Sequence, residues 1–171
     1  MRPLVLDASA GLKLVRPEPE SGSVSELVAE RLSGDIAVPE LFWLEVVNVL
    51  LRRHRYPAAS VLEAVRVLQE LGIRTLIADA ATTLAVVDLM ERHDLSAYDA
   101  AYLALALSMD ADLVTADRRL ALAAGDRAVL IGLGGIAEDR AAYRPRAATW
   151  PSWPEAGAYL AELRAVLASA P

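Results

Sequence analysis

Short apolar runs alternate along the chain with longer stretches in which apolar residues recur every three or four positions. Five of these runs have the length and character of buried strands. They lie at residues 3–6, 36–38, 73–77, 113–115 and 128–131. Strands that alternate with helical stretches are typical of an α/β fold, in which right-handed crossovers place helices on both faces of a parallel sheet.

The stretches between these strands predict helices, because glycines, prolines and capping residues mark their limits. The expected helices span residues 8–15, 23–32, 39–54, 59–71, 80–93, 97–109 and 118–124. Ser9 is a candidate cap for the first of them. The third carries an apolar stripe, which we expect to face the core, formed by Leu41, Leu44, Val47 and Leu51.

The strands and the candidate functional residues all fall within residues 1–135, which we expect to form one domain. Residues 136–149 are polar and show no periodicity, as expected of a linker. A capping box at 152–155 then precedes an amphipathic helix, so that 136–171 forms a C-terminal helical extension. The apolar stripe of that helix comprises Ala156, Tyr159, Leu160, Leu163, Val166 and Leu167.

Composition narrows the class of protein. The 171 residues include no cysteine, which excludes a disulfide scaffold, a thiolate nucleophile and an iron–sulfur cluster. No apolar run approaches the roughly 18 residues of a membrane span, and Asp7 comes too early for a signal peptide, so we expect a cytoplasmic protein without membrane association. The net charge of −6 argues against loose, salt-driven binding of nucleic acid. It is compatible with an enzyme that engages phosphate through metals held by carboxylates.

Four acids occupy positions where parallel α/β sheets bind ligands. Asp7 follows the first predicted strand and Asp117 follows the fourth, and ligands bind at the carboxyl ends of such strands. Glu45 and Asp99 lie near the starts of two helices, in otherwise apolar surroundings. Four carboxylates brought together repel one another unless a cation neutralises them. Oxygen ligands favour Mg²⁺ or Mn²⁺, and two such ions would activate a water and stabilise the leaving oxygen of a phosphodiester.

Each acid, taken singly, also has a structural explanation. Asp7 and Asp117 are in positions to cap the helices that follow them, and Glu45 could lie at the solvent edge of its helix. Ser96 and Asp99 fit a capping box. The joint placement of all four acids favours the metal site.

Four stretches of the chain match the motifs of a known family. They are residues 5–9, 45–50, 95–106 and 113–120. Through them the sequence resembles, over about residues 1–133, the PIN-domain ribonucleases, and most closely the VapC-type toxins of bacterial toxin–antitoxin pairs. The resemblance implies a PIN-like three-layer sandwich with a five-stranded parallel sheet in the order 3-2-1-4-5. It also implies an endoribonuclease dependent on Mg²⁺ or Mn²⁺.

The resemblance also assigns roles to individual residues. It implies that Asp7, Glu45, Asp99 and Asp117 are the catalytic and metal-binding acids, that Thr115 orients a water or a carboxylate, and that Ser9 and Asn48 support the site. The implied partners are an RNA substrate, a cognate antitoxin that covers the groove, and a second copy of the chain in a homodimer.

Two other protein classes are excluded because the sequence lacks a residue that each requires, and one alternative function remains. A phospho-accepting receiver domain needs a lysine after the fifth strand, and the only lysine is Lys13. A dehalogenase-type phosphatase needs an aspartate where Ser9 stands. The alternative that remains is a non-catalytic PIN-like scaffold that binds a protein partner and keeps the acids as a structural metal site. The basic run 52–55 is explained either by contact with RNA or by the preference for cations at helix C-termini.

Overall fold

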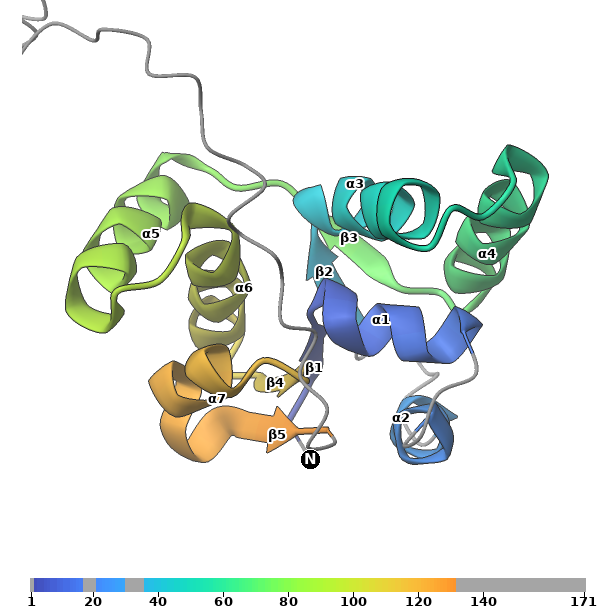
Figure 1. The fold of residues 1–171 in the computed structure, drawn as a ribbon. Helices are drawn as coiled ribbons and strands as arrows, with labels where there is room; N and C mark the ends of the chain where they lie inside the picture. The colour runs from blue at the N-terminus through green and yellow to red at the C-terminus, as the bar shows by residue number, and fades with distance from the viewer. Residues whose placement is uncertain (1, 17–20, 30–35, 132–171) are drawn as a thin grey trace, which may run out of the picture. The chain divides into compact units, whose positions relative to one another are not determined.

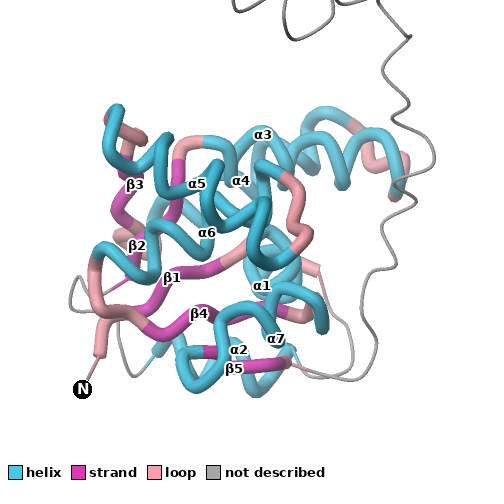
Figure 2. Tube along the Cα trace, turned by 90° about the vertical axis from the view of Figure 1, so that its left-hand side faces the viewer, coloured by secondary structure: helices cyan, strands magenta, loops and turns pink. Residues whose placement is uncertain are grey.

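The computed structural model describes residues 2–16, 21–29 and 36–131. Five parallel strands form one sheet in the order β3-β2-β1-β4-β5, which confirms the predicted fold class and strand order (Figure 2). The strands are β1 (Leu4–Leu6), β2 (Ile36–Pro39), β3 (Arg74–Leu76), β4 (Asp112–Thr115) and β5 (Ala128–Leu130). The predicted linker and final helix, 136–171, lie outside the described residues.

Helices cover both faces of the sheet and give three layers (Figure 1). One face carries α1 (Ala8–Val15), α2 (Ser21–Ala29), α3 (Leu41–Asn48) and α4 (Ala58–Glu70). The other carries α5 (Ala80–His93), α6 (Ala97–Ser108) and α7 (Arg118–Ala124). No helix in the described part of the chain is long and apolar enough to cross a membrane.

The central strands explain why the sequence shows uninterrupted apolar runs. All three residues of β1 are fully buried, because helices pack against both of their faces. The chain proceeds from β1 to β2 on one side of the sheet, whereas β4 joins β1 on the other side. Open α/β sheets bind ligands at such a reversal, outside the carboxyl ends of the strands, which here are β1 and β4.

The predicted limits of α1 are confirmed, but its cap is Asp7, as the structural explanation of that residue predicted, and not Ser9. The carboxylate of Asp7 accepts a hydrogen bond of 2.9 Å from the backbone N–H of Ala10. The predicted start of the third helix at residue 39 is wrong. Pro39 ends β2, so α3 begins at Leu41. Past Asn48 the same helix continues as a π-helical turn, Val49–Arg53, which apolar periodicity alone does not reveal.

The predicted apolar stripe of α3 is also wrong. Phe42, Val46 and Leu50 are fully buried, whereas the side chain of Leu44 is 73% exposed. The reason is the close packing of α3 against α1. A Cβ atom placed on Gly11 would come within 2.5 Å of the Phe42 ring, so the absence of a side chain at Gly11 sets which face of α3 turns inward.

Candidate active site

A buried carboxylate lies at the end of the central strand. Asp7 joins β1 to α1 and is only 5% exposed. Its Oδ1 accepts hydrogen bonds from the hydroxyl of Ser9 at 2.5 Å and from the backbone of Ala10 at 2.9 Å. Its Oδ2 accepts one from the hydroxyl of Thr115 at 2.5 Å. All three donors are neutral, so they orient the carboxylate without balancing its charge.

The protein environment disfavours the charged form of this group. Burial raises the pKa of Asp7 to about 6, although the hydrogen bonds from Ser9, Thr115 and Ala10 act in the opposite direction. The negative charge of Asp99 contributes to this rise, which indicates that the two carboxylates are within electrostatic range of each other. A cation bound beside Asp7 would relieve both effects.

Thr115, at the end of β4, connects two of the acids. Its side chain is fully buried, and its hydroxyl donates to Asp7 while accepting a hydrogen bond of 2.9 Å from the backbone N–H of Asp117. Ser9 makes a parallel connection, since its hydroxyl donates to Asp7 and accepts from the backbone N–H of Ala116 at 2.8 Å. The carboxyl ends of β1 and β4 are therefore joined through two hydroxyl groups.

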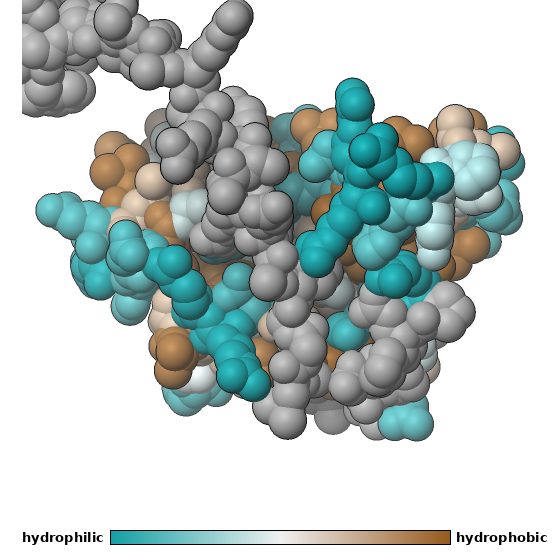
Figure 3. Space-filling view, in the orientation of Figure 1, coloured by the Kyte–Doolittle hydropathy of each residue, from teal (hydrophilic) through white to brown (hydrophobic). Residues whose placement is uncertain are grey.

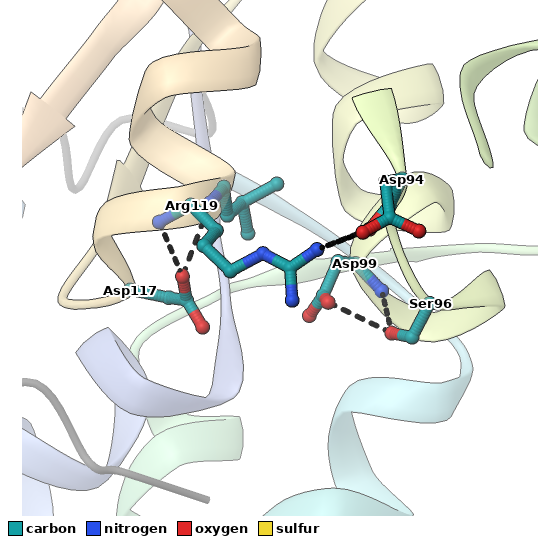
Figure 4. A network of polar contacts seen from close by, with 6 residues as sticks. Asp94, Ser96, Asp99, Asp117 and Arg119 are labelled. Carbon is teal, nitrogen blue, oxygen red and sulfur yellow. Dashed lines mark hydrogen bonds and ion pairs between the residues drawn. The ribbon is translucent and has the colours of Figure 1, made fainter. Parts of the chain in front are cut away.

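Asp117 caps α7, as one structural explanation of this residue predicted. Its Oδ1 accepts hydrogen bonds from the backbone N–H groups of Arg119 at 2.7 Å and Leu120 at 3.1 Å. Arg119 reaches across to the turn between α5 and α6, where its Nη2 donates to the carbonyl oxygen of Asp94 at 2.5 Å and to the Asp94 carboxylate at 2.8 Å (Figure 4).

Asp99 lies in the first turn of α6 and forms a variant of the predicted capping box. The hydroxyl of Ser96 accepts from the backbone N–H of Asp99 at 3.1 Å and donates to the Asp99 carboxylate at 2.8 Å. The carboxylates of Asp99 and Asp117 both point into the space between α6 and α7 (Figure 4). We call Asp99 and Asp117 the outer pair, and Asp7 with Ser9 and Thr115 the inner group.

Glu45 reaches the same region from the opposite layer of helices. It lies on α3 and is partly buried, and its Oε2 accepts a hydrogen bond of 2.5 Å from the hydroxyl of Tyr102 on α6. The charge of Asp7 also acts on this hydroxyl, so that Asp7 lies within electrostatic range of the phenol that binds Glu45.

Of the two residues predicted to support the site, Ser9 and Asn48, only Ser9 contacts one of the four acids. Ser9 contacts Asp7 directly, whereas Asn48 is exposed at the last residue of α3 and, within the described part of the chain, makes no hydrogen bond to any of the four acids. Tyr102 was not a candidate from the sequence. Its position three residues after Asp99 on a helix, which puts both on one face, is the signal that indicates it.

The donor set is suited to a hard divalent cation. Carboxylate and hydroxyl oxygens favour Mg²⁺ or Mn²⁺, and the buried Asp7 carboxylate has only neutral donors around it. As the side chains stand, no three acidic or histidine residues in the described ranges are close enough to hold one ion together. Mg²⁺ commonly keeps several waters and takes one or two carboxylates, so the residues fit an ion that is partly hydrated.

Comparison with known proteins gives a consistent family. Residues 4–126 match the PIN domain family. Ribonuclease VapC9 of Mycobacterium tuberculosis is 37% identical over 126 residues, an alignment that covers 68% of this chain and 87% of VapC9. Among solved structures, VapC20 of M. tuberculosis, a toxin that cleaves the sarcin–ricin loop, has 17% identity and a TM-score of 0.58, covering 70% of this chain and 94% of VapC20. A toxin–antitoxin complex from Klebsiella pneumoniae has 17% identity and a TM-score of 0.57, covering 74% and 95%.

Proposed function

This chain belongs to the PIN-domain family and, within it, to the VapC ribonucleases, and we propose that it hydrolyses RNA phosphodiester bonds at Asp7, Glu45, Asp99 and Asp117. The observation that carries the proposal is the placement of Asp7. A buried carboxylate whose donors, among the described residues, are all neutral is costly to the fold, and it lies at the strand ends where open α/β sheets bind ligands.

One or two of the four acids at a time would hold a partly hydrated Mg²⁺ or Mn²⁺, and a bound ion would supply activation of water and neutralisation of the charge that develops on the phosphodiester. The contribution of the chain itself is position. Thr115 and Ser9 fix both oxygens of Asp7, and Thr115 fixes the backbone of Asp117 in the same network. An acid held in place before substrate binds need not be reorganised during the reaction.

The partners we propose are RNA, an antitoxin and a second copy of the chain, in the cytoplasm, where such a substrate is found. The antitoxin is supported by the relatives, among which a toxin–antitoxin complex shares the fold. A protein partner is also supported by apolar side chains that lie exposed over α5, since exposed apolar patches mark interaction surfaces (Figure 3). The exposed apolar residues of this region are Ile77, Leu84 and Val87.

A non-catalytic scaffold is the second candidate, and one observation favours it. Asp7 and Asp117 both cap helices, and Asp99 bonds to the cap of α6, so these acids have structural duties that require no chemistry. A scaffold of this kind would bind an ion and gain stability without cleaving RNA.

Cleavage of a fluorogenic RNA by the full-length protein distinguishes the two candidates. We expect cleavage with Mg²⁺ or Mn²⁺ and none with EDTA. Glu45→Gln should lower the rate by about 10²-fold, the scale lost when one preorganised electrostatic group is removed. Glu40→Gln is the matched control, because Glu40 is exposed and precedes the same helix. A Tm raised by Mn²⁺ without any cleavage would favour the scaffold.

A further inference from the structure

Tyr102 places a hydroxyl group beside Glu45, one of the four acids Asp7, Glu45, Asp99 and Asp117 that we call the acidic cluster. The residue lies on α6, one turn after Asp99, and its side chain is 2% exposed. Its hydroxyl donates to Oε2 of Glu45, a residue 57 positions earlier in the chain, at 2.5 Å. This contact joins α6 to α3, which lies in the helix layer on the other face of the sheet.

The surroundings of this hydroxyl keep it as a donor. Burial raises the pKa of Tyr102 well above its usual range, and the negative charges of Glu45 and Asp7 add to the effect. The backbone of Ala8, at the start of α1, acts in the opposite direction. The hydroxyl thus stays protonated and donates to Glu45 on α3, within electrostatic range of Asp7.

Glu45 needs such a partner more than the aspartates do. Its side chain has more freely rotating bonds than that of aspartate, and fixing it costs conformational entropy. Ser9, Thr115 and Ser96 hold the carboxylates of Asp7 and Asp99. A group that fixes a ligand in the folded state lowers the cost of ordering it when the ion binds.

We propose that Tyr102 is a positioning residue for Glu45: its hydroxyl holds one oxygen of that carboxylate at the edge of the acidic cluster and so raises the affinity of the site for a divalent cation. The inference rests on the proposed function, because it assigns Glu45 to the cation site. Tyr102 acts only through Glu45 and contacts neither ion nor substrate.

The test is to compare Tyr102→Phe with the parent protein, because phenylalanine keeps the buried ring and removes only the hydroxyl. Tyr98→Phe is the matched control. Tyr98 lies on the same helix and is 56% exposed, and its side chain makes no hydrogen bond within the described part of the chain. Full-length variants are titrated with Mn²⁺, and binding is followed by calorimetry and by the rise in Tm. Cleavage of a fluorogenic RNA is measured over the same range of Mn²⁺.

Loss of a hydrogen bond to a metal ligand typically lowers metal affinity or activity by 10- to 100-fold. We therefore expect Tyr102→Phe to weaken Mn²⁺ binding by about 10-fold or more, with the Mn²⁺ concentration for half-maximal cleavage raised to match. Tyr98→Phe should behave as the parent does. In a Glu45→Gln background, Tyr102→Phe should have no further effect on Mn²⁺ binding, because the two residues act as one unit.

Three results would overturn the proposal. The first is Mn²⁺ affinity in Tyr102→Phe equal to that in Tyr98→Phe. The second is a lowered Tm without Mn²⁺ together with unchanged Mn²⁺ affinity, which would make the hydroxyl purely structural. The third is an effect of Tyr102→Phe that persists in the Glu45→Gln background. If the parent neither binds Mn²⁺ nor cleaves RNA, the proposed function fails, and this inference fails with it; in the three cases above the parent still cleaves.

Discussion

The carboxylates of the inner group and of the outer pair form hydrogen bonds with different parts of the chain. The outer carboxylates bond to groups two or three residues away along the chain, within the first turns of α6 and α7. The inner carboxylate of Asp7 also caps its own helix, but in addition it bonds to Thr115, 108 residues away. Caps of the outer kind stabilise any helix that carries them. A buried carboxylate without a cation opposes folding, which is why the proposed function rests on the inner group.

The largest effect should follow from removing the inner charge. Asp7→Asn keeps the shape of the side chain but removes its negative charge, and we expect RNA cleavage to fall by about 10²- to 10³-fold. The same variant should gain less Tm from Mn²⁺ than the parent. Asp126→Asn, at an exposed aspartate in the turn after α7, is the control and should cleave as the parent does. Cleavage by Asp7→Asn at the parent rate would assign the activity to another site.

A second prediction uses the pH dependence of stability without metal. The pKa of Asp7 is about 6 in the folded protein and 3.8 as its ordinary value. Because the folded state holds this proton more tightly, the associated stability is complete below pH 3.8 and is lost as the pH rises through 6. About two pKa units correspond to on the order of 3 kcal/mol.

The asparagine side chain in Asp7→Asn does not ionise between pH 4 and pH 7. The free energy of unfolding of this variant should therefore rise relative to that of the parent over this range. Urea unfolding of both proteins in EDTA at the two pH values measures the difference. Addition of Mn²⁺ at pH 7 should stabilise the parent and shrink the gap. A gap that is the same at both pH values would show that Asp7 is not strained by burial.

A third prediction separates the two duties of the outer pair. Asp117→Ala removes the cap of α7 and should cost about 1 kcal/mol in the free energy of unfolding. Asp117→Asn keeps a good cap and should cost little stability. Both should lose cleavage activity, because neither carries the charge. If the asparagine variant retains full activity, Asp117 is a cap and nothing more.

The smallest expected effect concerns Arg119, which ties α7 to the turn at Asp94. The arginine side chain is 56% exposed and that of Asp94 is 99% exposed, and exposed ion pairs contribute about 0.2–1 kcal/mol. Arg119→Ala should therefore lower the free energy of unfolding by less than about 1 kcal/mol relative to Arg118→Ala, measured by urea unfolding. A loss of several kcal/mol in the free energy of unfolding would contradict this prediction. It would mean that the position of the outer pair depends strongly on the contact between Arg119 and Asp94.

The same contrast explains which features the sequence could predict. Local signals sufficed for α5 and α7, whose predicted limits are confirmed at both ends, since caps and glycines mark them. The same local signals also predicted that Asp117 caps a helix. The inward face of α3 depends on the contact between Phe42 and Gly11, which lie on different helices, and periodicity cannot show it. The bond between Tyr102 and Glu45 is likewise invisible until both helices are in place.

The position of β1 in the sheet has a consequence for the cell that makes this protein. β1 is the first strand along the chain yet lies at the centre of the sheet. The hydrogen bonds that hold the Asp7 carboxylate are complete only when β4 has brought Thr115 beside it. Contacts between such distant parts of a chain form late, because a long loop must close first. On the proposed assignment of Asp7 to the active site, most of the chain is therefore synthesised before that site is complete. We expect the unfinished protein to be harmless to the messenger that encodes it, a safeguard that comes from strand order alone.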